Sequence, residues 1–226
     1  MHFLSGSGER MSNIGKQSGR SRAEQSSPRR TQEQRRESTR KQILTAAISL
    51  LQEKGYAGFR INEVAEKAQV SRGAQTHHFP TKESLLLAAL DQVYSDVRED
   101  TLSTIRSLGA DSDLIAALFQ NAERFFLGPN FSMALSLLNV GEGNGSLGRQ
   151  VQDLSKANRL PMEQEWVKAF MDRGVDRGLA TNIVSSAYCL FRGLAVRQLL
   201  VVDPEHVRLQ VDFLGRLLRK ELQLQS

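Results

Sequence analysis

The chain has 226 residues, 40% of them hydrophobic, which is enough to bury a core in one large domain or two small ones. A single cysteine, Cys189, excludes an internal disulfide, and four scattered histidines offer no metal-ligand spacing, so we expect neither a metal nor another cofactor. No apolar run approaches the ~18 residues that span a membrane, and no signal peptide opens the chain, so we expect a soluble, cytoplasmic protein.

The positive charge is concentrated near the N-terminus. Residues 1–41 carry ten Lys and Arg against four Glu, a net charge of +6, whereas the remaining 185 residues carry 20 basic and 21 acidic side chains. Residues 5–30 offer almost nothing to bury, so we predict a disordered basic tail over residues 1–30. Such a basic tail can bind phosphate groups or an anionic membrane surface. The alternative is a solvated tail without a partner.

The first helix is expected to begin near residues 31–37. Apolar residues recur at helical spacing over residues 43–51 and form one stripe. The helix should run to Lys54 and stop at Gly55, because glycine commonly ends helices.

Two short helices should follow, separated by a tight turn. Residues 61–68 place apolar side chains on one face and charged or polar ones on the other. The pattern breaks at Gln69, and Ser71 is a good N-cap for a helix over residues 72–79. Residues 61–79 therefore have the proportions of a helix-turn-helix, and the alternative is a small helical packing unit.

The rest of the chain also shows helical patterns. Thr81 is a plausible N-cap for a long helix with an apolar face, and no convincing run of strand residues occurs anywhere, so the expected fold is all-α. After residue 109 we expect helices over residues 114–127, 131–140, 147–174, 179–202 and 204–224, with a glycine-rich loop over residues 141–145.

Three stretches carry a family resemblance. They are QILTAAISLLQEKGY at residues 42–56, VAEKAQVSRGA at residues 64–74 and HHFPTKESLL at residues 77–86. Together they resemble the N-terminal DNA-binding domain of the TetR family of bacterial transcriptional regulators. The resemblance is specific across about residues 35–95 and only architectural beyond them.

The resemblance implies a homodimeric regulator that binds a double-stranded DNA operator. A helix-turn-helix domain over residues 31–82, with the motif itself at about 61–80, would precede a larger helical domain over residues 83–226 that binds a small molecule and dimerises. Effector binding would change the separation of the two recognition helices. Repression is the default expectation, since a bound dimer blocks a promoter.

Residues of the predicted recognition helix are the leading candidates for DNA contacts. Ser71 would cap the helix, Arg72 would grip a guanine edge or a phosphate, and Gly73 would let the backbone approach. By the resemblance, Lys82 holds the DNA backbone.

Several positions depart from the family pattern. Gln75 and Thr76 stand where an apolar residue and a tyrosine are usual, and Gln75 either contacts an adenine or lies buried within the domain. Gln69 stands where glycine is common, so a left-handed backbone there would cost about 1 kcal/mol. If Asn62 caps the helix, Arg60 is free to contact a phosphate. His77 is expected to face DNA, while His78 lies either at a phosphate or packed inside. The expected DNA contacts are Arg60, Asn62, Ser71, Arg72, Gly73, Gln75, Thr76, His77, His78 and Lys82.

The C-terminal helices are candidates for a dimer interface. Residues 183–200 carry apolar side chains on more than one stripe, and a helix that is apolar nearly all round must be covered on both sides. We therefore predict a homodimer through about residues 179–222, the alternative being a core helix of a monomer. Leu217 is one apolar position expected to face the partner.

An effector pocket should lie between the helices of residues 90–192. For each candidate the alternative is an ordinary core position, and the abundance of rings weakly favours an apolar or aromatic effector. The candidates are Phe119, Phe125, Phe126, Phe131, Met133, Leu137, Trp166, Phe170, Tyr188 and Arg192.

Parts of the sequence fit two rival functions. Gly143, Gly145 and Gly148 formally match the G-x-G-x-x-G fingerprint of a nucleotide-binding enzyme, but that motif needs a preceding strand and the flanks have helical patterns. The other rival is a non-specific DNA-organising protein that acts through the basic tail. No spacing of nucleophiles, bases or carboxylates indicates catalysis, so an enzyme is not expected.

Overall fold

The computed structural model describes residues 31–138 and 145–223, and these residues form nine α-helices and no strand, as the predicted all-α fold requires. The predicted tail over residues 1–30 and most of the predicted glycine-rich loop lie outside the described residues. The helices are α1 (Gln32–Gly58), α2 (Ile61–Lys67), α3 (Arg72–His78), α4 (Lys82–Ser107), α5 (Leu114–Phe126), α6 (Pro129–Leu138), α7 (Gly145–Met171), α8 (Arg177–Gln198) and α9 (Pro204–Gln223).

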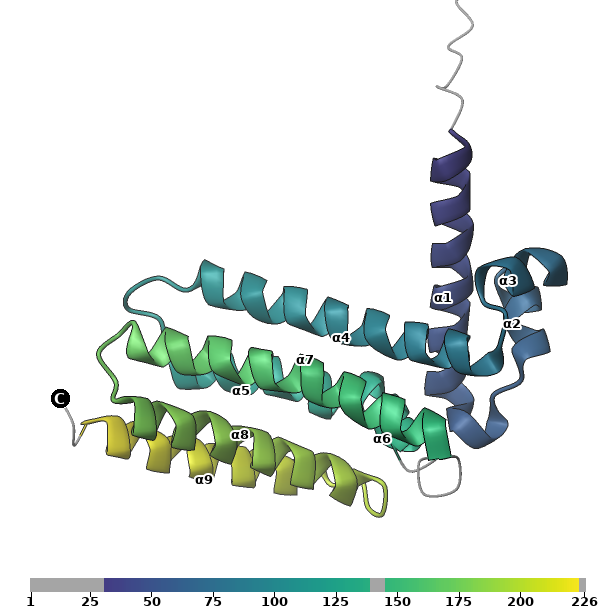
Figure 1. The fold of residues 1–226 in the computed structure, drawn as a ribbon. Coiled ribbons are helices and arrows are strands. Elements are labelled where there is room, and N and C mark those ends of the chain that lie inside the picture. The colour runs from purple at the N-terminus through teal and green to yellow at the C-terminus, as the bar shows by residue number, and fades with distance from the viewer. Residues whose placement is uncertain (1–30, 139–144, 224–226) are drawn as a thin grey trace, which may run out of the picture.

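The long helices form a bundle with a small helical unit at one end. Figure 1 shows α4, α7, α8 and α9 running roughly alongside one another, while α1 rises from one end of the bundle with α2 and α3 beside it. Helix α1 packs against α4 and α6, and α8 packs against α5 and α7. The short helices are therefore carried on the bundle through α1 and the start of α4.

Helix α1 begins and ends where its sequence predicts. The Thr31 hydroxyl accepts a hydrogen bond from the Gln34 N–H and the Gln34 side chain accepts one from the Thr31 N–H, which together satisfy two free donors of the first turn. Gly55 has a φ of 61° and interrupts the helix, so the residues after it form a separate last turn. The expected stop at Gly55 is confirmed.

The turn between α2 and α3 is built on a left-handed glutamine. The Gln69 N–H donates to the Glu66 carbonyl and the Val70 N–H donates to the Ala65 carbonyl, a paired arrangement that closes many helices. It requires a positive φ at the residue after the C-cap, and Gln69 has a φ of 55°. Ser71 then caps α3, because its hydroxyl accepts from the Ala74 N–H at 3.1 Å. Gln69 therefore has the left-handed backbone for which the cost was expected, and the predicted cap at Ser71 is confirmed.

Helix α4 contributes to two hydrophobic cores. Thr81 caps it in a reciprocal pair with Ser84, as expected for the N-cap. Its first half buries Leu85 and Leu86 in a core shared with α1, α2 and α3 and with the facing turns of α6 and α7. Its second half runs beside a separate core made by α5, α7 and α8, where Ile105 packs at the edge.

Helix α8 ends earlier than its apolar pattern predicts. It stops at Gln198 instead of residue 202, because Pro204 lacks the N–H of a helix interior and opens α9. Asp203 closes the turn, since its carboxylate accepts from the His206 N–H and lies 3.6 Å from the Arg197 guanidinium. The apolar residues released from the helix, 199–202, are all more than half exposed.

The outward face of α8 also differs from the prediction of a second apolar stripe. Its buried residues, including Ile183 and Phe191, all face α5, α7 and α9, and its exposed positions include Ser185, Ser186 and Cys189. By length and mean hydropathy α8 passes as a membrane-spanning helix, but most of its apolar residues are buried inside the protein, as in a core helix. Exposed apolar side chains lie at Val196 near the end of α8, in residues 199–202 and on α9.

Replacing Gln69 with glycine should stabilise the protein. Gly adopts a positive φ without the clash that a Cβ causes, so we expect Gln69→Gly to raise the free energy of unfolding by roughly 0.5–1 kcal/mol in urea titrations. Gln69→Ala is the control, because alanine keeps the Cβ. Equal stability of the Gly and Ala variants would show that Gln69 carries no backbone strain.

Candidate functional site

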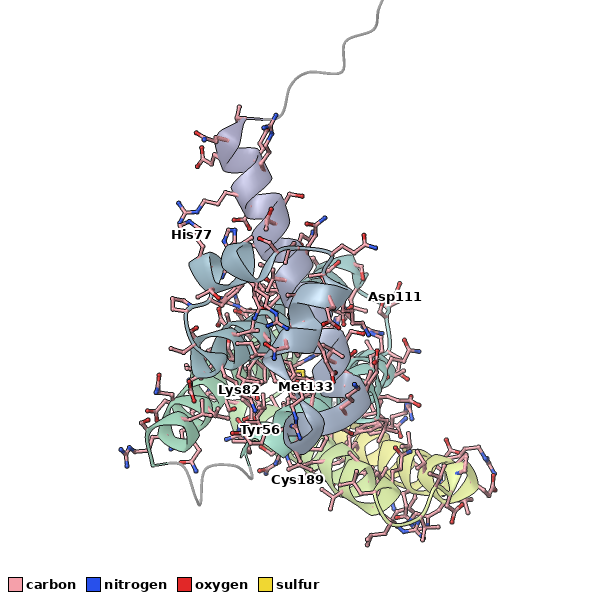
Figure 2. All side chains as sticks on the ribbon, turned by 90° about the vertical axis from the view of Figure 1, so that its right-hand side faces the viewer. Tyr56, His77, Lys82, Asp111, Met133 and Cys189 are labelled. Atoms are coloured by element: carbon pink, nitrogen blue, oxygen red, sulfur yellow. The ribbon has the colours of Figure 1, made fainter. Side chains whose placement is uncertain are left out.

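Helix α3 presents a polar edge to solvent. Arg72, Thr76 and His77 are exposed, and Arg72 and Thr76 lie four residues apart on one face of the helix. Figure 2 shows His77 at the outer end of α3, away from the bundle. Within the described chain Arg72 forms no ion pair, so its guanidinium fork is available for a guanine edge or a phosphate. Gly73 is exposed beside it and leaves the backbone accessible.

Gln75 belongs to the inner face of α3, which corrects its inclusion among the DNA contacts. Its exposed fraction is 4%, and it lies four residues before the buried Phe79 on the side that faces the core. A side chain in this position cannot contact an adenine edge without leaving the core. The alternative of a buried glutamine, left open by the sequence, fits the structure.

The two neighbouring histidines differ in environment. His77 is exposed, whereas His78 is half-buried and its ring centroid lies 5.7 Å from that of His77. Burial, followed by the positive charges of His77, Arg36 and Arg40, lowers the pKa of His78 below its ordinary value. The lowered pKa favours the neutral imidazole, which offers a hydrogen bond to a phosphate but no charge.

The structure contradicts the capping role predicted for Asn62 and gives Arg60 partners on the backbone. No side chain caps the start of α2, so Asn62 does not take over that task. Arg60 is exposed, and its Nη1 donates to the Ala57 carbonyl at 2.8 Å and to the Phe59 carbonyl at 3.3 Å, so its contact with phosphate stays a prediction. The last carbonyls of a helix lack hydrogen-bond donors within it, and here Arg60 supplies the donor.

Lys82 closes the junction between α1 and α4. Its ammonium group lies 4.5 Å from the centroid of the Tyr56 ring and donates to the Phe59 carbonyl at 3.4 Å. Figure 2 shows Tyr56 and Lys82 close together on the same side of the molecule. The side chain is half-buried, so it orients the helix-turn-helix in addition to any phosphate contact. Tyr56 was not singled out in the sequence, where it looks like one more aromatic residue after a helix end.

Further basic residues of α1 flank α3. Arg40 lies 5.6 Å from the ring centroid of Phe79, and Arg36 and Arg40 are close enough to His78 to act on its pKa. The N-terminal turns of α1 extend beyond α3 (Figure 1). By contrast, Lys54 and Lys67 near α2 are paired with Glu63 and Glu53. The uncompensated positive charge thus lies on the α1 and α3 side, where a polyanion would be attracted.

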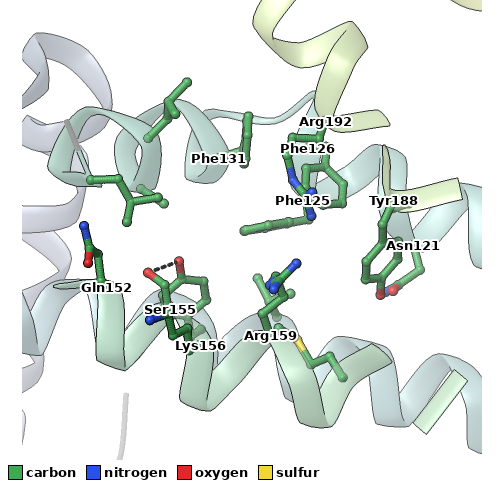
Figure 3. A pocket seen from close by; sticks show the side chains of 17 residues that line it. Asn121, Phe125, Phe126, Phe131, Gln152, Ser155, Lys156, Arg159, Tyr188 and Arg192 are labelled. Atoms are coloured by element: carbon green, nitrogen blue, oxygen red, sulfur yellow. Dashed lines mark hydrogen bonds between the residues drawn. The ribbon is translucent and has the colours of Figure 1, made fainter. Parts of the chain in front are cut away.

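A second candidate site is a cavity of about 310 Å³ enclosed by α4, α5, α6, α7 and α8 (Figure 3). Its apolar part is made of Phe125, Phe126 and Phe131, whose ring centroids are 5.0 to 6.0 Å apart in edge-to-face geometry. Tyr188 adds a fourth ring 5.5 Å from Phe126. The volume lies at the lower end of small-molecule sites, so it suits a compact ligand.

Half of the predicted pocket residues line this cavity. Phe125, Phe126, Phe131, Tyr188 and Arg192 do so. The remaining candidates are buried in the two cores and are corrected to packing positions, because a 3.6-residue apolar period does not distinguish a core face from a pocket face. These are Phe119, Met133, Leu137, Trp166 and Phe170.

The polar lining of the cavity was missed in the sequence. Gln152, Ser155, Lys156 and Arg159 on α7 all reach it, and the Tyr94 hydroxyl donates to the Ser155 hydroxyl at 2.9 Å. Their spacing marks one face of a helix, but a face of this composition ordinarily lies in water. Only the placement of α7 against α4 turns it toward a cavity.

A buried asparagine joins the cavity to three helices. Asn121 of α5 lines the cavity and is 4% exposed. Its carbonyl oxygen accepts from the Thr101 hydroxyl of α4 and from the Trp166 indole of α7, each at 3.1 Å. Its amide donates to the Asp100 carboxylate at 3.0 Å, and Asp100 is also paired with Arg124. Buried networks of this kind hold their helices in one arrangement.

The described residues do not provide the surroundings that the enzyme alternative needs. Gly145 opens helix α7, and no strand occurs in the described ranges to precede a nucleotide-binding turn. No group of three or more His, Cys, Asp and Glu side chains in those ranges has the arrangement of a metal site. Gly143 lies outside the described residues.

Comparisons with known proteins agree with this geometry. The family model described as "Bacterial regulatory proteins, tetR family" matches residues 43–89, which hold α2, α3 and parts of α1 and α4. The HTH-type transcriptional regulator CymR of Pseudomonas putida is 39% identical over 177 residues, covering 78% of this chain and 87% of that protein.

Solved structures of low sequence identity share the fold. A TetR family regulator from Cytophaga hutchinsonii superposes with a TM-score of 0.64 at 15% identity, covering 82% of this chain and 96% of that one. The multidrug binding protein EbrR, solved with malachite green, gives a TM-score of 0.52 at 20% identity, covering 80% and 96%.

Removing the asparagine network should destabilise the bundle. Asn121→Leu leaves the buried Trp166 indole N–H and the Thr101 hydroxyl without a partner, so we expect the free energy of unfolding to fall by about 2–4 kcal/mol in urea titrations. Asn158→Leu is the matched control, since Asn158 bonds only to the Leu154 carbonyl of its own helix. Equal losses in the two variants would contradict a stabilising role for the network.

Proposed function

Because the chain belongs to the TetR family of bacterial transcriptional regulators, we propose that it is a repressor that leaves its operator when a small molecule fills the cavity. It regulates transcription as a DNA-binding protein, and we infer a cytoplasmic protein without catalytic activity. The observation that carries the proposal is the course of α4, which reaches from the DNA-binding unit into the lining of the cavity.

The exposed edge of α3 is the proposed base-contacting surface. An α-helix fits the major groove of DNA, where the Arg72 fork matches the two acceptors of a guanine. Thr76 and His77 lie on the accessible part of the same helix, and Gly73 permits close approach. Arg36 and Arg40 at the side of α3 are placed to meet phosphates, which position the protein without selecting sequence.

Helix α4 is the proposed link between ligand and DNA. Leu85 and Leu86 near its start are fully buried in the core beneath α2 and α3, while Tyr94 and Val97 line the cavity. A ligand that pushes α4 away from α7 therefore also moves the first core and with it α3. We propose a DNA-binding unit at residues 31–82, up to the first residue of α4, and an effector and dimerisation unit at residues 83–226.

We further propose a homodimer through α8 and α9, within about residues 179–222. Leu209, Phe213 and Leu217 are spaced four residues apart on α9 and are each about half exposed, at 51%, 53% and 48%. Val196 at the end of α8 adds to this apolar surface, with 44% exposed. A contiguous exposed apolar stripe on a soluble protein indicates a surface that another subunit covers.

Arg72→Ala should weaken binding to the selected operator by about 1–3 kcal/mol and change non-specific binding little, because base contacts specify and phosphate contacts position. Arg72→Lys should weaken binding to the selected operator by a similar amount, since lysine keeps the charge but lacks the planar fork of the guanidinium. Lys82→Ala should weaken both kinds of binding alike. Fluorescence anisotropy on DNA selected from a random pool and on an unrelated duplex makes the comparison. Equal losses for Arg72→Ala on both DNAs would contradict its role.

Leu217→Glu should convert the dimer into monomers and abolish operator binding together, because a charge buried at an apolar interface is costly. The matched control is Leu160→Glu, since Leu160 on α7 is 50% exposed and lies outside the proposed interface. Light scattering at micromolar concentration measures the mass. A wild-type mass of one chain would remove the basis for the dimer.

A further inference from the structure

The cavity described above combines an apolar floor with an excess of positive charge. Three of its lining residues, Lys156, Arg159 and Arg192, are cations, and none of the residues that line it is acidic. Of the carboxylates near the lining, that of Glu163 lies 3.3 Å from Arg159, and that of Asp100 is bonded to Asn121 and paired with Arg124. Among the described residues, Lys156 and Arg192 form no ion pair.

The cations approach the apolar floor from two helices. Figure 3 shows Arg192 entering from α8 and Arg159 from α7, with both guanidinium groups directed toward the middle of the cavity and the phenylalanine rings beside them. The Arg192 guanidinium carbon lies 5.5 Å from the ring centroid of Phe126, and the residue is half-buried. Arg192 is thus partly removed from water without a carboxylate to compensate it.

A hydroxyl without a partner lies next to Arg192. Tyr188 precedes Arg192 by four residues on α8, so both side chains face the cavity, and Tyr188 is 7% exposed. Within the described chain its hydroxyl makes no hydrogen bond. Burial, followed by the negative charge of Glu163, raises the pKa of Tyr188, so the group remains a neutral phenol that can donate.

We propose that the ligand of this cavity is an organic anion, with a flat apolar body of one or two rings and one carboxylate-sized acidic group. The body lies against Phe125, Phe126 and Phe131, and the acidic group accepts hydrogen bonds from Arg192 and the Tyr188 hydroxyl, with Arg159 and Lys156 adding positive potential. This inference rests on the proposed function, because it names the class of effector that would release the operator.

The alternatives fit the cavity less well. A neutral apolar ligand would exclude water from Arg192 without replacing its hydration, which is costly for a charged group. A cationic ligand would meet three like charges and no free carboxylate in the lining. An anion is the one class that gains from both the rings and the cations.

The protein carries its own reporter of binding. Trp166 is the single tryptophan of the chain, is fully buried and donates to Asn121, which lines the cavity. Its fluorescence should therefore respond when the cavity fills. The probes are benzoate and 2-naphthoate, each compared with its uncharged amide and with the corresponding arylmethylamine, titrated into the full-length protein to about 1 mM, the limit of weak binding.

In wild-type protein we expect at least one carboxylate to bind at least about tenfold more tightly than its amide, since hydrogen bonds to charged groups have this strength. The amines should not bind. Equal or tighter binding of the amides or amines, or no carboxylate binding up to the limit, would overturn the proposal.

Arg192→Gln should erase most of the preference for carboxylate over amide, and Tyr188→Phe should reduce it by a smaller factor. Lys168→Gln is the matched control, because Lys168 is an exposed cation of α7 outside the cavity lining. An unchanged preference in Arg192→Gln would contradict the assigned contact, and the amide affinity shows whether the variant keeps a folded cavity.

Operator binding is measured in the same samples with and without the carboxylate. Carboxylate binding that leaves operator affinity unchanged would support the ligand class and contradict effector release. Operator binding without any carboxylate binding would contradict the ligand class and support the DNA-binding function. The two proposals therefore fail separately.

Discussion

Helix α4 is shared by two hydrophobic cores, and the arrangement of the whole chain depends on that sharing. Leu85, Leu86 and Leu90 are fully buried beneath the helix-turn-helix, and Thr101 is equally buried at the other end against α5. A helix held at both ends by close packing moves as one body, because packed interiors resist deformation. We therefore propose that a change at the cavity is passed to α3 as a displacement of α4. The family's regulators respond to small molecules, and this geometry supplies a physical route for such a response.

The DNA-binding unit is fastened to α4 by polar contacts as well as by packing. Lys82 sits over the Tyr56 ring and bonds to the Phe59 carbonyl, while Arg60 holds the carbonyls of Ala57 and Phe59. These contacts surround the end of α1, where helical carbonyls lack partners. Two cations expected to meet DNA thus help to fix the angle at which α3 is presented. Arg72 on α3 and the arginines of the adjoining turns of α1 add further positive charge on the side of α3.

The sequence predicted the helices well and the side-chain environments less well. The ends of α1, α3 and α4 follow from local chemistry that involves only a few residues, such as the caps at Thr31, Ser71 and Thr81. The end of α8 was missed because its apolar pattern continues past Gln198 and Pro204 alone signals the turn. At the DNA surface Arg72 and His77 are exposed as a base-contacting helix needs, but the burial of Gln75 depends on how α3 sits on α1. In the cavity the rings of Phe126 and Tyr188 could be predicted, whereas the polar face of α7 could not. Gln152, Lys156 and Arg159 remain exposed in the structure, so only the position of α7 beside the cavity distinguishes them from an ordinary solvated face.

Trp166 also allows the coupling through α4 to be tested most directly, without knowledge of the effector. Thermodynamic linkage is reciprocal: if the ligand changes the affinity for DNA, DNA must change the affinity for the ligand by the same factor. Adding operator DNA, selected from a random pool, should therefore change the emission or the acrylamide quenching of Trp166, which lies behind the cavity and is bonded to Asn121. An unrelated duplex at equal concentration should change it much less. If saturating operator, verified by anisotropy of the labelled DNA, leaves both signals of Trp166 unaltered, then α4 does not connect the cavity with the DNA-binding unit.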